Sequence, residues 1–278
     1  MKYDILYKEK EEDNIMMNPD EILAKSIDAG VHKVHKTFIE KAILGFIGGA
    51  MISLGYLLYI RVISDIAEQW GSFASFIGAC VFPIGLIVIL LAGGELITGN
   101  MMAVATAFFD RKVSFLQLVR NWIIISIFNV IGAVFVAYFF GHMVGLLDGA
   151  HFRHETILLA TNKIKQTFIQ SLVSGVGCNW FVGLALWLSY GAKDAAGKIM
   201  GIWFPIMAFV AIGFQHSVAN AFVIPAAIFE GGATWMQFIQ NFIPVYLGNI
   251  IGGAIFTAGF YYLSYKRIME ENKDLEKI

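Results

Sequence analysis

The sequence has little charge, and what charge it has is unevenly distributed. Only 15% of the 278 residues are charged, whereas soluble domains average about 25%. Of the 41 charges, 16 lie in residues 1–41 and eight lie from Lys266 onward, so residues 42–265 carry only 17. A water-soluble fold is therefore not expected, and we expect the middle of the chain to lie in membrane lipid.

Other absences narrow the function. Cys80 and Cys178 are the two cysteines, too few for a zinc site or a disulfide framework. The net charge of −1 offers no basic patch, so no nucleic-acid partner is expected. The chain has no Walker A motif for an ATP-driven pump. Residues 151–155 (HFRHE) look like metal ligands but lack the HExxH order, and we expect them in a loop. No metal, no other cofactor and no enzyme activity are expected.

Charge-free runs predict six membrane spans. A span needs about 20 apolar residues, and the sequence offers spans at residues 38–60, 70–109, 118–143, 166–190, 198–229 and 236–265. The second run is too long for one span and contains Glu95 in the segment GGELITGN, residues 93–100. Because glycine weakens a helix, this segment predicts an interrupted helix.

The two halves of the chain are related by an internal repeat. At an offset of 120, Asn100, Asn121 and Asn129 recur as Asn220, Asn241 and Asn249, and at an offset of 130 residues 37–40 and Gly45 recur as residues 167–170 and Gly175. Because each repeat contains three spans, an odd number, the second half crosses the membrane in the opposite orientation to the first. An inverted repeat with an interrupted helix in each half is typical of transport proteins. We expect an all-α membrane protein with a channel domain at residues 37–266, containing repeats at residues 37–143 and 166–265.

Both termini are predicted to be cytoplasmic in a multi-pass protein of the cell membrane, inner or plasma. The loops on that side carry five basic residues against four on the other: Arg111, Lys112, Arg120, Lys193 and Lys198 against Arg61, Arg153, Lys163 and Lys165. Tails at residues 1–36 and 267–278 flank the channel domain.

Within the first tail, Asn18 and Pro19 predict the start of an amphipathic helix with Ile22, Leu23, Ile27 and Val31 on its apolar side. Two interpretations remain open, a surface anchor at the lipid headgroups and a mobile plug beneath a pore. The basic residues at 32–36 are expected to form a solvated face.

Polar residues at the helix breaks predict a cavity inside the membrane, since free backbone groups must be buried in protein or line water. The first break offers Glu95, Thr98 and Asn100, and the second, GFQHSVAN at 213–220, offers His216 and Asn220. An ionisable residue within the membrane suggests function, so we expect a pathway role for His216 rather than a core hydrogen bond. Structural roles are expected for the others: Glu95 caps half-helix amides, and Asn100 and Asn220 satisfy free backbone groups.

Three segments resemble motifs of the formate/nitrite transporter family of pentameric anion channels: LLAGGELITGN at 90–100, GVGCNWFVGLALWLSY at 175–190 and GFQHSVANAFVIP at 213–225. With NKIKQTF at 162–168, the resemblance covers about residues 19–266. It implies an aquaporin-like protomer with six transmembrane helices, of which the second and fifth are interrupted. It also implies a homopentamer in membrane lipid, with a separate pore in each protomer.

The resemblance also implies roles for individual residues. Thr98 matches the loop threonine, His216 the central histidine, and Lys163 the vestibule lysine, for which snorkelling at the interface is the alternative. Asn179, otherwise an interhelical contact, and Asn220 match pore-side asparagines. The apolar constrictions fall on Phe82, Leu86, Leu96, Ile97 and Phe209. The sequence departs from the family pattern at Ile97, where formate channels usually have an aromatic residue, and at Gln215, where a glutamate is common. The second departure weakens a carboxylate–histidine proton relay.

These features predict a channel or transporter for formate or a similar small monovalent anion, with passage that depends on pH and can be coupled to protons. If His216 or its network supplies a proton, the substrate crosses the apolar rings as a neutral acid and avoids the desolvation cost of a bare charge. Nitrite, hydrosulfide, acetate and lactate fit the same chemistry. An aquaporin-like pore for neutral solutes is one alternative, but neither break contains the Asn-Pro-Ala motif of water channels. A membrane-embedded enzyme is a second alternative.

Overall fold

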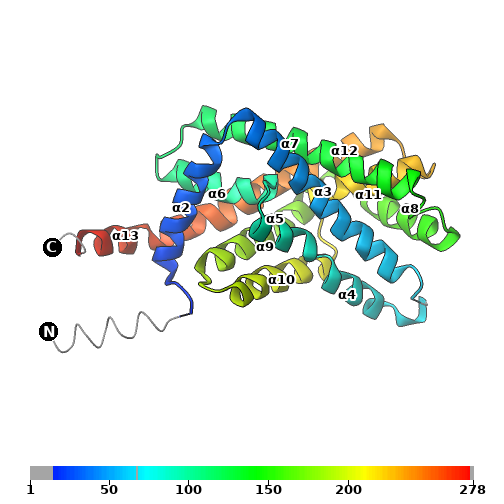
Figure 1. Ribbon diagram of the computed structural model, residues 1–278, viewed down its shortest axis with the longest axis horizontal. Coiled ribbons are helices and arrows are strands. Elements are labelled where there is room, and N and C mark those ends of the chain that lie inside the picture. Colours follow the sequence, from blue (N-terminus) through cyan, green and yellow to red (C-terminus); the bar gives the residue numbers. More distant parts are fainter. Residues whose placement is uncertain (1–14, 67, 276–278) are drawn as a thin grey trace.

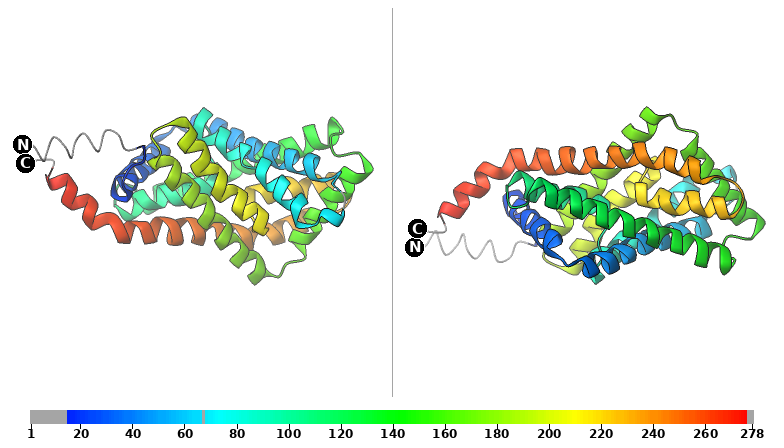
Figure 2. Two further views of the ribbon diagram at one scale, coloured as in Figure 1. Left: turned by 90° about the horizontal axis from the view of Figure 1, so that it is seen from below. Right: turned by 90° about the horizontal axis from the view of Figure 1, so that it is seen from above.

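The computed structural model describes residues 15–66 and 68–275. In these ranges six helical stretches are long and apolar enough to cross a membrane: Phe38–Ile63, Ser72–Ala92, Phe115–Met143, Phe168–Gly191, Ala195–Ile212 and Trp235–Asn272. The predicted all-α architecture with six spans is confirmed. The helices α2 (Pro19–His35) and α13 (Phe260–Leu275) lie at one end of the bundle and α8 (Ala150–Ile164) at the other (Figures 1 and 2).

Each half of the chain contributes three spans, and the middle span of each half is broken. The first half contains α3 (Phe38–Ile63), α4 (Ser72–Val81), α5 (Ile84–Ala92), α6 (Ile97–Phe109), α7 (Phe115–Phe135) and the π-helix η2 (Val136–Met143). The second half contains α9 (Phe168–Gly191), α10 (Ala195–Ile212), α11 (Ser217–Phe229), α12 (Trp235–Ile250), the π-helix η3 (Ile251–Gly259) and α13. A short 3-10 helix, η1 (Glu68–Trp70), precedes α4.

The first span of each half begins with the same local chemistry. Thr37 and Glu40 form a capping box at the start of α3, and Thr167 and Gln170 form one at the start of α9. In both boxes the threonine hydroxyl accepts a hydrogen bond from the backbone N–H of the residue three positions later. The side chain of that later residue accepts a hydrogen bond from the threonine N–H. The repeat seen in the sequence therefore specifies equivalent helix starts.

The breaks require glycine at equivalent positions. Helix α5 ends at Gly93 with φ of 103°, and α10 ends at Gly213 with φ of 90°. Both values lie in the region that side chains with a Cβ rarely adopt. The chain resumes as α6 and α11 after four non-helical residues in each case. The interruptions predicted in the second and fifth spans are thereby confirmed, and a further boundary at Pro83, between α4 and α5, was not expected.

One local prediction is wrong, and one of the two interpretations left open for α2 does not fit the structure. Residues 151–155 lie in α8, not in a loop, because the Leu- and Ala-rich residues that follow them continue a helix. The apolar side of α2 is not a lipid-facing anchor: Ile22, Leu23 and Ile27 are buried, and a Cβ on Gly30 would lie 2.1 Å from the carbonyl oxygen of Ala103 in α6. Helix α2 therefore packs closely on the half-helix that begins at the first break.

Candidate functional site

The two breaks meet at one pair of side chains. Thr98 Oγ1 lies 2.9 Å from His216 Nε2, and both residues are buried, with exposures of 0% and 3%. The backbone N–H of Ala219 donates to His216 Nδ1 at 3.2 Å. A backbone amide can only donate, so Nδ1 is the acceptor and Nε2 of the neutral ring carries the proton. His216 therefore donates to Thr98.

Asn129 holds the first break open. Its side-chain oxygen accepts from the backbone N–H of Ile97 at 2.8 Å, and its amide donates to the carbonyl oxygens of Gly45 at 2.6 Å and Glu95 at 2.8 Å. The N–H of Ile97 and the carbonyl of Glu95 lie where the helix is interrupted and have no partner within a regular helix, whereas Gly45 lies inside α3, so the bond to its carbonyl ties α7 to the first span.

Asn249 does the same at the second break. Its oxygen accepts from the N–H of Ser217 at 2.9 Å, and its amide donates to the carbonyls of Gly175 at 2.9 Å and Gln215 at 3.3 Å. Every partner lies at the repeat offset from its counterpart around Asn129. The asparagines that satisfy the free backbone groups are therefore Asn129 and Asn249, and the expectation that Asn100 and Asn220 do so is wrong.

Asn100 and Asn220 instead each begin a short series of hydrogen bonds, and the two series match. Asn100 donates to Asn121 at 3.0 Å, and Asn121 donates to the carbonyl oxygen of Lys33 at 3.1 Å. In the second repeat Asn220 donates to Asn241 at 2.8 Å, and Asn241 donates to the carbonyl oxygen of Lys163 at 3.1 Å. In each half, two hydrogen bonds thus connect the half-helix to the backbone of the lysine that precedes the first span.

On the α8 side, a cavity of about 210 Å³ leads to His216. We call it the Lys163 cavity, and its lining includes Lys163, Tyr56, Tyr59, Phe82, Phe209 and His216. The rings of Phe82 and Phe209 lie edge to face, with centroids 6.0 Å apart. Tyr56 and Tyr59 were not predicted from the sequence, because tyrosines near the end of an apolar span are also typical of the membrane interface.

Beyond the two phenylalanines lies a central cavity of about 10 Å³, at the lower limit for one water molecule. It is lined by Ile52, Phe82, Leu86, Leu96, Val182, Ile206, Phe209 and His216. Four of the five residues predicted for the constrictions therefore surround the histidine. The fifth, Ile97, lies outside this lining and contributes its backbone N–H to Asn129.

A third cavity, of about 310 Å³, opens on the α2 side. We call it the Lys33 cavity, and its lining includes His32, Lys33, Lys36, Ile89, Glu95 and Tyr190. Glu95 is 3% exposed and lies 2.9 Å from the Lys33 ammonium and 3.7 Å from that of Lys36. Its carboxylate joins α2 to the break and does not cap the half-helix as expected. Lys33, predicted to be solvated, is 13% exposed and paired.

Lys163 has no such partner. Among the described residues it forms no ion pair, and its ammonium lies 6.0 Å from the ring centroid of Tyr56. Burial lowers the pKa of Lys163 to about 8, because an ammonium loses hydration there. At neutral pH the lysine still carries its charge into the cavity.

Asn179 lies beside the pair rather than in the lining of these cavities. Its amide donates to the carbonyl oxygens of Thr98 at 3.2 Å and Asn249 at 2.7 Å. Its own side-chain oxygen, like those of Asn100 and Asn220, is buried and has no hydrogen-bond partner among the described residues. Asn179 therefore links α9 to both the first break and the scaffold of the second.

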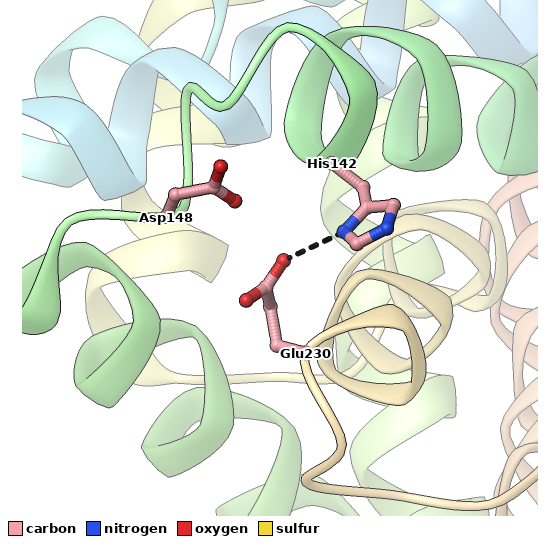
Figure 3. A group of neighbouring side chains, drawn as sticks. All are labelled: His142, Asp148 and Glu230. Atoms are coloured by element: carbon pink, nitrogen blue, oxygen red, sulfur yellow. Dashed lines mark hydrogen bonds and ion pairs between the residues drawn. The ribbon is translucent and has the colours of Figure 1, made fainter.

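A separate cluster of His142, Asp148 and Glu230 lies at the α8 end (Figure 3). Glu230 is 7% exposed, and its oxygens lie 3.2 Å from His142 Nδ1 and 3.5 Å from Arg153 Nε. A cation would have to compete with Arg153 and His142 for the carboxylate. We interpret the cluster as an ion-paired clamp that joins η2, α8 and the end of α11.

The fold and the site define a class of protein. Two inverted halves whose broken helices meet between cavities, near the middle of the bundle, form a membrane transport protein. The sequence profile of the formate/nitrite transporters matches residues 20–263, and the chain belongs to this family. Membership confirms the prediction of transport in place of enzyme activity.

Three relatives match this chain over nearly their whole length. The chain is 56% identical over 260 residues to the uncharacterized transporter YrhG of Bacillus subtilis (strain 168), covering 94% of this chain and 98% of the relative. It is 50% identical over 249 residues to the formate channel BtFdhC of Bacillus thuringiensis, with coverages of 90% and 96%. A probable formate transporter of Methanothermobacter thermautotrophicus is 42% identical over 260 residues, with coverages of 87% and 95%.

Solved structures share the fold. An FNT family ion channel superposes with a TM-score of 0.81 at 23% identity, covering 88% of this chain and 98% of the other. A pentameric formate channel with formate bound superposes with a TM-score of 0.72 at 28% identity, with coverages of 82% and 97%.

Proposed function

We propose that this chain is the protomer of a homopentameric channel that carries formate, or a similar small monovalent anion, across the membrane. The observation that carries the proposal is the Thr98–His216 pair, a polar site enclosed by apolar residues between two cavities that each contain lysine. The formate channel that is 50% identical supports the choice of substrate, and the solved pentameric formate channel supports both substrate and assembly.

The proposed pathway crosses the cavities in order. The anion collects in the Lys163 cavity, passes Phe82 and Phe209, meets Thr98 and His216, and leaves past Leu86 and Leu96 into the Lys33 cavity. Helices α6 and α11 begin at the two breaks, and helix N-termini favour negative charge. The apolar rings oppose a bare anion, because removing a charge from water costs several kcal/mol even after relaxation.

His216 offers the substrate one hydrogen bond through Nε2. To hand this proton to an anion, the ring must first take up a second proton at Nδ1, which releases the Ala219 amide. After the transfer the ring is neutral again and the substrate is a neutral acid, able to cross the apolar rings. These proton-transfer steps make passage depend on pH and couple it to protons. Between substrates, Thr98 remains the hydrogen-bond partner of the His216 ring.

Asn179 and Asn220 serve this pathway indirectly in our account. Asn179 fixes the Thr98 backbone, and Asn220 extends the polar network toward Lys163. Glu95 and Asn100 hold the first break in place.

We propose that residues 37–266 form the channel domain, with repeats at 37–143 and 166–265, in the cell membrane with both termini cytoplasmic. Helices α2 and α13 lie at the same end of the molecule (Figure 2), and the loops at that end carry more basic residues. Residues 1–14 and 276–278 of the proposed tails lie outside the described residues. Lipid surrounds the spans, and no nucleic-acid partner is proposed.

The test is flux into proteoliposomes at two pH values, with formate, nitrite, hydrosulfide, acetate, lactate and glycerol as separate substrates. We expect formate to pass with internal acidification. Nitrite or hydrosulfide passing far faster than formate would overturn the choice of substrate within the family. Glycerol passing faster than every anion would support the aquaporin-like alternative.

A further inference from the structure

The repeat places Lys33 and Lys163 in equivalent positions at opposite ends of the pathway. Asn121 donates to the carbonyl oxygen of Lys33 and Asn241 to that of Lys163, both at 3.1 Å. The lysines are 130 residues apart and the asparagines 120 apart, as in the rest of the repeat. The backbone of each lysine is therefore held in the same way.

The residues at repeat-related positions of the two breaks, 95 and 215, differ in charge. Glu95 lies at the first break, and its carboxylate pairs with Lys33 at 2.9 Å. At the repeat-related position the chain has Gln215, a neutral amide that is 0% exposed.

The partners of Gln215 are neutral as well. Its oxygen accepts from Asn220 at 2.7 Å and Asn241 at 2.8 Å, and its amide donates to Gln166 and, at 3.5 Å, to Ser171. The second break therefore presents no carboxylate to the lysine of its own half.

This difference decides what each ammonium can bind. The Lys33 ammonium already has a carboxylate partner, and Lys36, which shares that carboxylate, is 28% exposed and screened by water. The Lys163 ammonium lies in a cavity that leads to His216 and forms no ion pair among the described residues. A partly desolvated cation without a counter-ion attracts an anion more strongly than a paired one.

We propose that residues 95 and 215 set the sidedness of the channel: Gln215 leaves Lys163 free to hold the transported anion, whereas Glu95 occupies Lys33, so the anion is captured more tightly from the α8 face. The inference rests on the proposed function of anion transport. It makes Gln215 and Glu95 positioning residues, which act on the substrate through the lysines.

Thermodynamics limits how the kinetic constants for uptake from the two faces can differ. In a passive channel with equal pH and no voltage, the ratio of maximal flux to half-saturating concentration is the same in both directions. Tighter capture at the α8 face therefore lowers the half-saturating concentration and the maximal flux together when substrate is added there. A difference in half-saturation between the two faces is the quantity to measure.

The experiment uses right-side-out and inside-out membrane vesicles containing the full chain, with initial uptake of labelled formate measured over a range of concentrations at equal internal and external pH. In the wild type we expect a half-saturating concentration about tenfold lower from the α8 face, at the lower end of the range of electrostatic capture effects. Gln215→Glu should remove this difference by raising the value at the α8 face alone. Glu95→Gln should also reduce it, by lowering the value at the α2 face.

Both substitutions keep the size of the side chain. The Gln166 amide can rotate and the Ser171 hydroxyl can donate, so a carboxylate at 215 finds donors, and Asn129 bonds the backbone of Glu95 and not its side chain. The double variant, with Glu95→Gln and Gln215→Glu, should reverse the difference between the faces. Pentamer content by size exclusion confirms assembly of each variant.

The outcomes separate the inference from the proposed function. Formate uptake no greater than that of vesicles without the protein would reject formate as substrate, and the same series is then run with nitrite. Side-specific half-saturation that is unchanged in Gln215→Glu, or altered equally at both faces, would overturn the inference while leaving transport intact. A reversal in the double variant would establish it.

Discussion

Thr98 and His216 are 118 residues apart in sequence, yet Thr98 Oγ1 lies 2.9 Å from His216 Nε2. The contact joins the N-termini of two half-helices from opposite halves of the chain. Because the Ala219 amide occupies Nδ1, the ring can present only its Nε2 proton, and Thr98 or a passing anion must accept it.

Removing the Thr98 hydroxyl should impair transport more than it impairs folding. Thr98→Val keeps the shape but leaves the His216 N–H unpaired, and we expect formate flux to fall about tenfold, the equivalent of one hydrogen bond. Thr98→Ser keeps the hydroxyl and should retain most of the flux. Proteoliposome uptake compares the two, and equal flux in Thr98→Val and Thr98→Ser would count against the pair as a substrate site.

Reversing the charge of Lys163 should nearly abolish anion flux. Lys163→Glu puts a carboxylate in the cavity that leads to His216, and we expect a loss of about tenfold or more because steering by a single cavity charge is of this order. Lys165→Glu serves as the matched control, since Lys165 lies outside that lining and should have a smaller effect. If the two variants lost flux equally, Lys163 would have no special place in the pathway.

The lowered pKa of Lys163 predicts a second pH effect. Since the ammonium is charged below about 8, anion capture from the α8 face should decline as the pH on that face rises through this value. Arginine stays charged at every accessible pH, so Lys163→Arg should lack this part of the decline. The measurement is half-saturation against pH at the α8 face, and an identical profile in Lys163→Arg would show that Lys163 does not titrate in the working range.

Loss of the Asn129 side chain should destabilise the protomer. Asn129→Ala leaves the N–H of Ile97 and the carbonyl of Glu95 unpaired and removes the bond to the carbonyl of Gly45, and each buried unpaired group costs about 1–3 kcal/mol. Asn272→Ala removes only an exposed bond to Asp20 and should be neutral. Thermal unfolding of the detergent-solubilised pentamer tests this, and similar melting temperatures for the two variants would exclude a scaffold role for Asn129.

The sequence predicted the spans and the breaks because local signals specify them. Long apolar runs, paired glycines and repeat offsets are all readable without a structure. The polar residues at the breaks pointed to Thr98 and His216, and the resemblance added Lys163. The ion pair of Lys33 with Glu95 could not be predicted in this way, because 62 residues separate the two and the pairing depends on how α2 packs.

The roles of the asparagines were also beyond the sequence. Asn129 and Asn249 were visible as repeated residues, but two of the three partners of each are backbone groups that become free only where a helix breaks. Asn100 and Asn220 have the same repeat spacing, and only the three-dimensional arrangement directs their amides to other side chains. The equivalence of Lys33 with Lys163 was available from the offset of 130 and was missed, because the segment around Lys33 was interpreted as a solvated face.

The most direct test of the account is formate flux with simultaneous internal pH in proteoliposomes carrying wild type, His216→Asn or His216→Phe, after insertion and pentamer assembly have been checked. Wild type should acidify the interior as formate enters. Asparagine keeps a donor but does not titrate, so His216→Asn should pass some anion with little dependence on pH, whereas His216→Phe fills the site and should abolish coupled uptake. Wild-type proton-coupled flux in His216→Asn would contradict the protonation of His216, and wild-type flux in His216→Phe would contradict the pathway itself.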